Sequence, residues 1–474
     1  MMGRRRRDQS RLFYEFRLED RIPQDHLLRR MNVFVTAALA DLHKELKPYY
    51  SDIGRPSIDP ELMIRMLLVG YCYGIRSERR LVQEIELNLA YRWFCKLDLD
   101  DETPHHSTFS ANRLGRFRES DLLRHIFERV VWSAMAMGLV KGEGFAVDAS
   151  VLEANASRYH GVPPEGLDWT DEQRQRRAVA EYLAAVEADG SDSTEQDAGD
   201  DEGGPEEPRR RQTDRKTPKV ISPSDPSSAW TAKANKRVQF GYGLNYLIDV
   251  ENAVIVDVEA TPARTYDEVE ATKVMIDRTE RCFDLRPKRL AADTAYGIGR
   301  FLGWLVKEKR IAPHIPVWDK SQRDDGTFSR LDFVFDRKRN VYVCPAGKPM
   351  TTSGRMNADN GIRYFASGLD CRACALKPKC CPNLASRRIV RDLDEDARDV
   401  ARAKMKTKAF LRSRDERKRV EMRFAHLKTH HGFERLRLRG LSGARDEFLL
   451  AAIVQNLKTM AMRLVRPPPG LSAA

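Results

Sequence analysis

The order of strand and helix signals between residues 141 and 317 is the feature that most constrains the fold. Short apolar runs that are typical of strands alternate there with polar turns and amphipathic helical patterns. The signals run in the order strand 144–150, a hairpin of strands 238–248 and 253–258, helix 267–282, strand 289–293, helix 298–309 and strand 312–317. Strands followed by alternating helices and strands predict an α/β fold, in which helices flank a mixed sheet.

Two of the predicted strands end in an aspartate. Asp148 closes the run GFAVD, and Asp293 closes the run RLAAD. Ligand chemistry in open α/β sheets gathers at the carboxyl ends of strands. Taken alone, a strand-end aspartate is most often a turn cap, so the pair points to chemistry only if a third group joins it.

A third carboxylate, Glu421, lies in the basic helical stretch RKRVEMRFAHLK. Helix positions three, four and seven apart share a face, which aligns Glu421 with Arg417, Phe424 and Lys428. Most helix glutamates are solvated, but oxygen ligands from two strands and one helix suit two Mg²⁺ or Mn²⁺ ions. Such ions, about 3.5–4 Å apart, support phosphodiester cleavage. The three carboxylates therefore predict a metal site, and the flanking cations predict contacts to a phosphodiester.

Composition favours an acidic partner for this chain. Its 474 residues carry a formal net charge of +12 at pH 7, which is typical of nucleic-acid binding. No run of about 18 apolar residues occurs, so no membrane span is expected. The basic N-terminus lacks the apolar core of a secretory signal, which predicts a cytoplasmic protein.

Changes in composition predict the domain boundaries. Short helix signals with polar turns and surface arginines fit a helix-turn-helix-like DNA module, and a dimerisation bundle is the alternative. The predicted domains are a basic tail with a first helix at 1–50, a helical DNA-binding domain at 51–140 and a catalytic domain at 141–465, which includes a largely disordered acidic and Pro-rich insertion at 161–228 and a Cys-rich β insertion at 320–400.

Four cysteines of the Cys-rich insertion have the pattern of a zinc site. Cys371 and Cys374 are separated by two residues, Cys380 follows, and Cys344 lies upstream beside a proline. Four thiolates bind Zn²⁺ in structural sites. Cys381 is an alternative to Cys380 as the fourth ligand, and a set of reduced thiols is the alternative to any metal. A zinc ion would stabilise an insertion that has few apolar residues.

Three motifs together resemble bacterial insertion-sequence transposases of the DDE class. They are FAVDASVLEANAS, LAADTAYG and RKRVEMRFAHLK, and the resemblance covers most of residues 50–465. It implies a ribonuclease-H-like catalytic core with Asp148, Asp293 and Glu421 as the metal-binding triad. The family's helix signature, Tyr-x2-Arg-x3-Glu-x6-Lys, is matched except at its first position, which Arg414 occupies.

The resemblance also implies an activity and its partners. The chain would cut element ends with two Mg²⁺ or Mn²⁺ ions and join the freed 3′-hydroxyl to target DNA by transesterification. Arg414, Arg417 and Lys428 would hold DNA phosphates. The partners would be double-stranded DNA with terminal inverted repeats, target DNA and a second copy of the chain, in the cytoplasm at the bacterial nucleoid. A catalytically silent DNA-binding protein and a ribonuclease-H-like nuclease without strand transfer are the alternatives.

Overall fold

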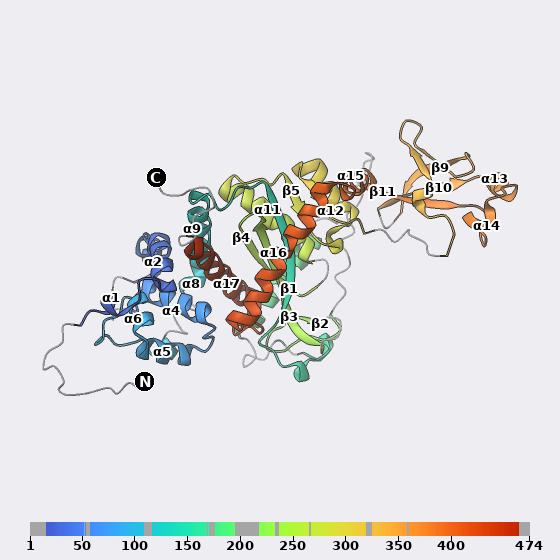
Figure 1. Cartoon of the computed structure of the whole chain (residues 1–474). Coiled ribbons are helices and arrows are strands. Elements are labelled where there is room, and N and C mark those ends of the chain that lie inside the picture. Colours follow the sequence, from blue (N-terminus) through green and yellow to red (C-terminus); the bar gives the residue numbers. More distant parts are fainter. Residues whose placement is uncertain are drawn as a thin grey trace, which may run out of the picture. The chain divides into compact units, whose positions relative to one another are not determined.

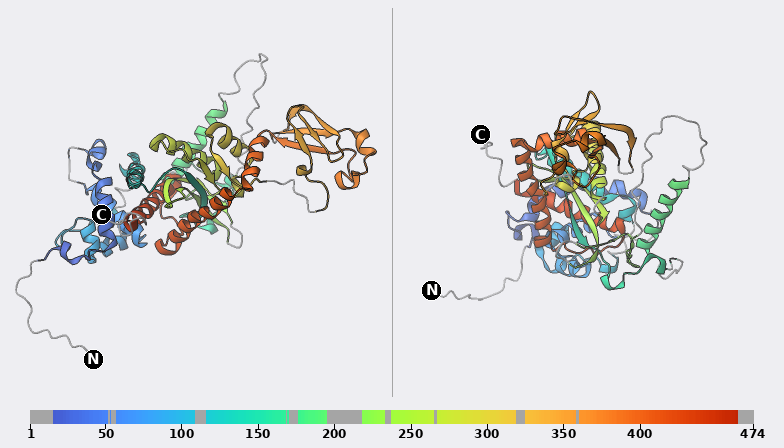
Figure 2. Two further views of the ribbon diagram at one scale, coloured as in Figure 1. Left: turned by 45° about the horizontal axis from the view of Figure 1, so that its top comes forward. Right: turned by 90° about the vertical axis from the view of Figure 1, so that its right-hand side faces the viewer.

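A computed structural model shows two compact units (Figures 1 and 2). The helical unit comprises residues 1–140 and 423–474, and the α/β unit comprises residues 141–422. The structure describes residues 16–463 except 52, 54–56, 109–115, 168, 170–175, 195–217, 233–236, 265–266, 319–324 and 358–359. None of the helices in this described part is both long and apolar enough to span a bilayer.

The helical unit is built around the last helix of the chain, α17 (Gly440–Arg463), which is buried along most of its length. This helix packs against α9, α2 and α4. The other described helices are α1 (Leu18–Arg21), α2 (Leu27–Ala38), α3 (Leu42–Leu46), α4 (Pro60–Tyr73), α5 (Glu78–Leu87), α6 (Leu89–Phe94), α8 (Arg116–Glu119) and α9 (Leu122–Ala136). The range 141–465 expected for the catalytic domain thus includes a helix whose neighbours are the N-terminal helices.

A buried ion pair ties α17 to the end of α4. The Glu447 side chain is completely buried and pairs with Arg76, and it also accepts hydrogen bonds from the Tyr71 hydroxyl (3.2 Å) and the backbone N–H groups of Arg437 and Leu438 (2.6 Å each). Every oxygen of this carboxylate therefore has a donor, which is the condition under which a charge is tolerated in a protein interior.

The α/β unit contains a six-stranded mixed sheet in the order β2-β3-β1-β5-β6, with β4 paired to β3. The strands are β1 (Gly144–Glu153), β2 (Ala229–Thr231), β3 (Gln239–Asp249), β4 (Val254–Pro262), β5 (Arg289–Ala291) and β6 (Ala312–His314). Strands β3 and β4 form the predicted hairpin, while β1, β5 and β6 run parallel. This arrangement confirms the expected mixed α/β sheet beside a helical N-terminal region.

Helices connect and cover the strands of this sheet. Helix α11 (Asp267–Phe283) packs on β3 and β4, and α12 (Gly299–Gly303) continues as a π-helix at Trp304–Lys309. Within the predicted insertion at 161–228, the structure contains α10 (Arg177–Thr194) and a bridge between Val162 and Ile221, and residues 195–217 lie outside the described part.

A second sheet, antiparallel and five-stranded, occupies the Cys-rich insertion. Its order is β11-β10-β9-β8-β7. The elements are β7 (Val334–Asp336), β8 (Val341–Val343), β9 (Pro349–Met356), β10 (Gly361–Ala366), α13 (Gly368–Arg372), α14 (Lys377–Cys380) and β11 (Arg388–Asp392). Helices α15 (Glu395–Met405) and α16 (Lys408–His431) follow, and α15 packs against α12 and β6 of the first sheet.

Candidate functional site

The first two predicted carboxylates occupy equivalent positions on neighbouring parallel strands. Ala146 of β1 pairs with Ala291 of β5, and this is the last pair of that ladder. Asp148 and Asp293 each follow two residues later. Because parallel strands lie about 4.8 Å apart and side chains alternate between faces, equal offsets bring the two carboxylates to one side of the sheet.

The strand that carries Asp148 is longer than the sequence suggests. The apolar run ends at Asp148, but β1 continues to Glu153 because it stays paired with the long hairpin strand β3, where Asp148 faces Tyr246. The Asp148 carboxylate accepts a hydrogen bond from the backbone N–H of Ala149 (2.8 Å). Asp148 therefore lies just beyond the point where pairing with β5 ends. Strand β1 itself continues past Asp148, paired with β3.

Asp293 lies just after β5 and caps a short 3₁₀-helix, Thr294–Tyr296. Its Oδ1 accepts a hydrogen bond from the backbone N–H of Ala295 (2.9 Å). One carboxylate oxygen is thus held by the turn, which fixes the side chain at the sheet edge and leaves Oδ2 available for a ligand.

Helix α16 brings the third carboxylate, and Arg417 joins it to the first. The Arg417 guanidinium donates to Asp148 (Nη1–Oδ2, 3.3 Å) and pairs with Glu421 one turn along the helix (Nη2–Oε1, 2.9 Å). The Asp148 side chain is 19% exposed and that of Glu421 is 50% exposed. A cation therefore already lies between two carboxylates that come from different elements.

Sequence reasoning did not find the contacts that hold α16 on the sheet (Figure 1). Arg289, the first residue of β5, donates to the Ser413 hydroxyl and pairs with Glu416 (2.8 Å). Ser413 Oγ also lies 2.7 Å from Nδ1 of His314 on β6. Burial and then the charge of Arg289 lower the pKa of His314 to about 4, so its ring is neutral when it forms a hydrogen bond with Ser413. These bonds set the register of α16, and so the position of Glu421.

The carboxylates interact electrostatically. Burial raises the pKa of Asp148 to about 6, against the lowering effects of the Ala149 N–H and Arg417, and the charges of Asp293 and Glu421 raise it further. A buried carboxylate near two others binds a proton or a metal ion more readily than an isolated one does. The negative charge around Asp148 is therefore not fully compensated by Arg417.

We expect Asp148→Asn to stabilise the metal-free chain at neutral pH. An aspartate whose pKa is raised on folding loses stability as pH rises from its ordinary value of 3.8 through about 6. The variant avoids that loss, which amounts to at most about 3 kcal/mol. Thermal melts without divalent ions should show an advantage for the variant at pH 7.5 that shrinks at pH 4.5. A variant less stable than wild type at both pH values would contradict this electrostatic description.

No group of three or more His, Cys, Asp or Glu side chains in the described residues is placed to hold a metal ion. The Glu421 carboxylate forms its ion pair with Arg417, and only its charge acts on Asp148. The Glu421 side chain is half exposed and one helical turn from Arg417, which also contacts Asp148. The donor set itself consists of hard oxygen ligands, the kind that Mg²⁺ and Mn²⁺ take.

Comparison with known families finds two matches, in separate parts of the chain. A model described as a transposase domain matches residues 16–114, and a transposase DDE domain matches residues 343–461. The two matches indicate an insertion-sequence transposase of the DDE class. The DDE-domain match includes Glu421, whereas Asp148 and Asp293 lie outside both matches. No curated protein and no solved structure matches the transposase.

The two outer positions of the helix signature lie apart from the carboxylates. Arg414 is exposed and its nearest carboxylate is that of its neighbour Asp415 (3.6 Å). Lys428 lies about two turns after Glu421 on α16, in the part that belongs to the helical unit. Of the three cations predicted to bind DNA, Arg417 is the one with a described contact to the predicted carboxylates.

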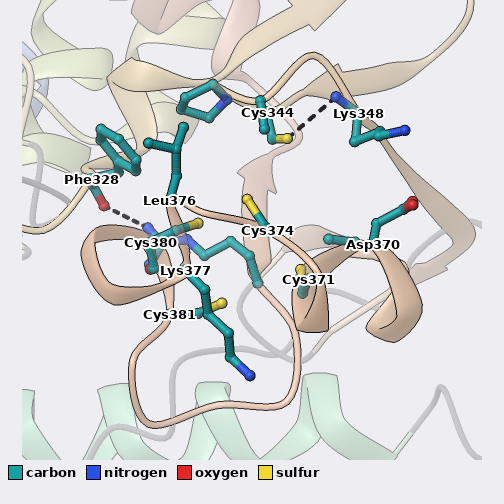
Figure 3. Close-up of a pocket in the computed structure, with 14 residues that line it drawn as sticks. Phe328, Cys344, Lys348, Asp370, Cys371, Cys374, Leu376, Lys377, Cys380 and Cys381 are labelled. Atoms are coloured by element: carbon teal, nitrogen blue, oxygen red, sulfur yellow. Dashed lines mark hydrogen bonds between the residues drawn. The ribbon is translucent and has the colours of Figure 1, made fainter.

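Five cysteines of the transposase line one pocket (Figure 3). Cys371 lies on α13, Cys374 just after it, Cys380 ends α14 and Cys381 follows. Cys344 comes from the turn between β8 and β9, where its Sγ accepts from the Lys348 N–H (3.4 Å). All are free thiols, and burial raises the pKa of Cys380 to about 11. The structure therefore gathers the four predicted residues and the alternative, Cys381.

Proposed function

We propose that this transposase cuts the ends of its element and joins the freed 3′-hydroxyl to target DNA with two divalent ions. The observation that carries the proposal is the seating of Arg417 between Asp148 and Glu421, with Asp293 at the matching position of the next strand. Asp148 and Glu421, which come from a strand and a helix, thus share one cation, and Asp293 would join them as the third carboxylate.

The sheet supports a ribonuclease-H-like core for this site. A long antiparallel hairpin, β3 and β4, lies on one side of β1, and the parallel strands β5 and β6 lie on the other. Helix α16 then returns to this sheet far along the chain, with Glu416 paired to Arg289. The insertions lengthen the chain between these elements, while Arg289 and Glu416 still join α16 to the sheet.

The donor set fits two Mg²⁺ or Mn²⁺ ions. Asp148, Asp293 and Glu421 would hold these ions. Such ions, when bound, activate the attacking oxygen and stabilise the leaving oxygen of a phosphodiester. Arg417, displaced from the carboxylates, would bind a DNA phosphate through its planar fork of donors, and Arg414 and Lys428 would bind phosphates on either side.

Further parts of the proposal concern the partners. Residues 51–140 would bind the terminal inverted repeats, and the catalytic domain would act from residue 141 onward. Because a transposition reaction must process two element ends, the transposase would work as a homodimer on DNA. The net charge of +12 supports binding to the duplex before any specific contact forms.

The test is incubation of the full chain with Mn²⁺, a target plasmid and a labelled duplex that carries the repeats flanking its own coding sequence. The proposal predicts cleavage that leaves a 3′-hydroxyl at the element end, followed by joining of that strand to the plasmid. Cleavage without joining would indicate a nuclease, and binding without cleavage would indicate a catalytically silent DNA-binding protein.

We also propose that the cysteine pocket binds one structural Zn²⁺ through Cys344, Cys371, Cys374 and either Cys380 or Cys381. Metal analysis of the purified chain should find about one zinc per chain, because thiolate sites of this kind take a single ion. The double variant Cys371→Ser/Cys374→Ser should lose it. Cys282→Ser, a change at a cysteine outside the pocket, should retain it. Zinc-free wild type purified without chelators would contradict the proposal.

A further inference from the structure

The five-stranded sheet of the Cys-rich insertion has one buried face and one exposed face. Tyr342, Met350, Tyr364 and Ile389 point into a small core together with Cys380 and Cys381. Because successive side chains of a strand point to opposite faces, the residues between them lie on the other face, which we call the outer face. The outer face is therefore available to a binding partner.

Strand register places arginines and apolar side chains side by side on the outer face. Phe365 of β10 lies opposite Thr351 of β9 and Arg388 of β11, and Arg363 of β10 lies opposite Val390 of β11. Phe365 is 45% exposed and Val390 is 44% exposed, and both arginines are exposed. Large apolar side chains thus face solvent between two guanidinium groups.

The arginines of the outer face differ from their neighbours in the same strand. Arg387 is buried and donates to the carbonyl oxygens of Phe328 (2.8 Å) and Cys380 (2.9 Å). Arg391 is buried too and donates to the Tyr342 hydroxyl (3.2 Å). Within the described residues, no carboxylate pairs with Arg363 or Arg388. Alternate arginines of this segment therefore hold the fold, while Arg363 and Arg388 keep all their donors for a partner.

The charge of the insertion indicates which partner. Residues 333–392 contain 12 Lys and Arg against 4 Asp and Glu, a formal net charge of +8. A strongly basic surface attracts nucleic acid, and the planar guanidinium group of an exposed arginine binds phosphate oxygens in pairs. The apolar side chains between them would contact the sugars of the backbone.

We propose that the outer face binds the phosphodiester backbone of the DNA duplex on which the transposase acts, through Arg363 and Arg388 with Phe365 between them. This inference rests on the proposed function, since it assumes that DNA is the substrate. It adds a binding surface to the insertion. The cysteine pocket lies on the opposite, buried side of the same sheet and would stabilise this face without touching the DNA.

The test is fluorescence anisotropy of a labelled duplex with the full chain, over a range of salt concentrations and without added divalent ions. Arg363→Ala/Arg388→Ala should weaken binding about tenfold at 0.1 M salt and reduce the slope of log K against log salt by about 1.8, or two phosphate contacts. Phe365→Ala should weaken binding without changing the slope, since it removes no charge.

The matched control is Arg372→Ala/Lys379→Ala, which removes the same charge from exposed positions of α13 and α14, outside the outer face. Its slope should stay within about 0.5 of wild type. Equal losses in the two double variants would mean that only overall charge matters, and would overturn the inference. Cleavage is not measured in this assay, so a failure of the outer face is distinguishable from a failure of the carboxylate site; a wild type that binds no DNA would overturn both.

Discussion

Glu421→Gln is expected to lower the single-turnover rate of DNA cleavage by on the order of 10³-fold, while the affinity for DNA stays within about twofold. Glutamine has the shape of glutamate but no negative charge, so it cannot hold a divalent ion against the phosphodiester. Arg417 would lose its partner on α16 and keep Asp148. The rate would be measured with enzyme in excess over a labelled terminal-repeat duplex in Mn²⁺.

Glu434→Gln provides the control for this change. Glu434 is exposed and lies in the same basic C-terminal region, 13 residues after Glu421. The control variant should cleave at the wild-type rate, because Glu434 is not one of the proposed metal ligands. Equal rates for Glu421→Gln and wild type would remove Glu421 from the site, and a loss in both variants would point to a general effect of charge.

Glu447→Gln should destabilise the helical unit by about 3 kcal/mol, because it leaves the Arg76 guanidinium buried without its counter-charge. The change keeps the volume of the side chain and removes only the charge. A thermal melt of the full chain should show the transition of this unit lowered by roughly 6–12 °C.

Glu84→Gln is the matched control for Glu447→Gln, because Glu84 pairs with Arg80 on the surface of α5 (3.2 Å; side chains 39% and 70% exposed). Exposed pairs of this kind contribute about 1 kcal/mol or less. A shift for Glu447→Gln as small as that of the control would show that the buried pair does not hold α17 in the helical unit.

The order of elements in the α/β unit was predictable because each strand and helix has its own local pattern. The hairpin β3–β4 and helix α11 follow directly from periodicity and turn residues. The length of β1 could not be predicted, because the polar residues after Asp148 stay in the strand only through pairing with β3. Tertiary pairing overrides local composition there.

The neighbours of a helix are harder to derive than the helix. The run from Phe448 onward predicts a buried helix. Because the helix is apolar on all sides, its sequence does not show which helices pack against it. The structure packs α17 with α9, α2 and α4. The bonds from Arg289 to Ser413 and Glu416 join residues more than a hundred positions apart, and no local pattern relates them.

The cysteine pocket could be predicted in part. Cys371 and Cys374 have a recognisable local spacing, whereas Cys344 joins them only through the turn between β8 and β9. The sequence did not decide whether Cys380 or Cys381 is the fourth zinc ligand. In the structure both of these adjacent cysteines line the pocket.

The most direct test of the carboxylate site is a count of Mn²⁺ bound to the complex of the full chain with its terminal-repeat duplex, by electron paramagnetic resonance of the free ion. We expect about two ions per chain for wild type, and fewer for Asp148→Asn and for Glu421→Gln. Wild-type complexes that bind no Mn²⁺, or variants that bind as much as wild type, would contradict the assignment of Asp148, Asp293 and Glu421 as the metal-binding site.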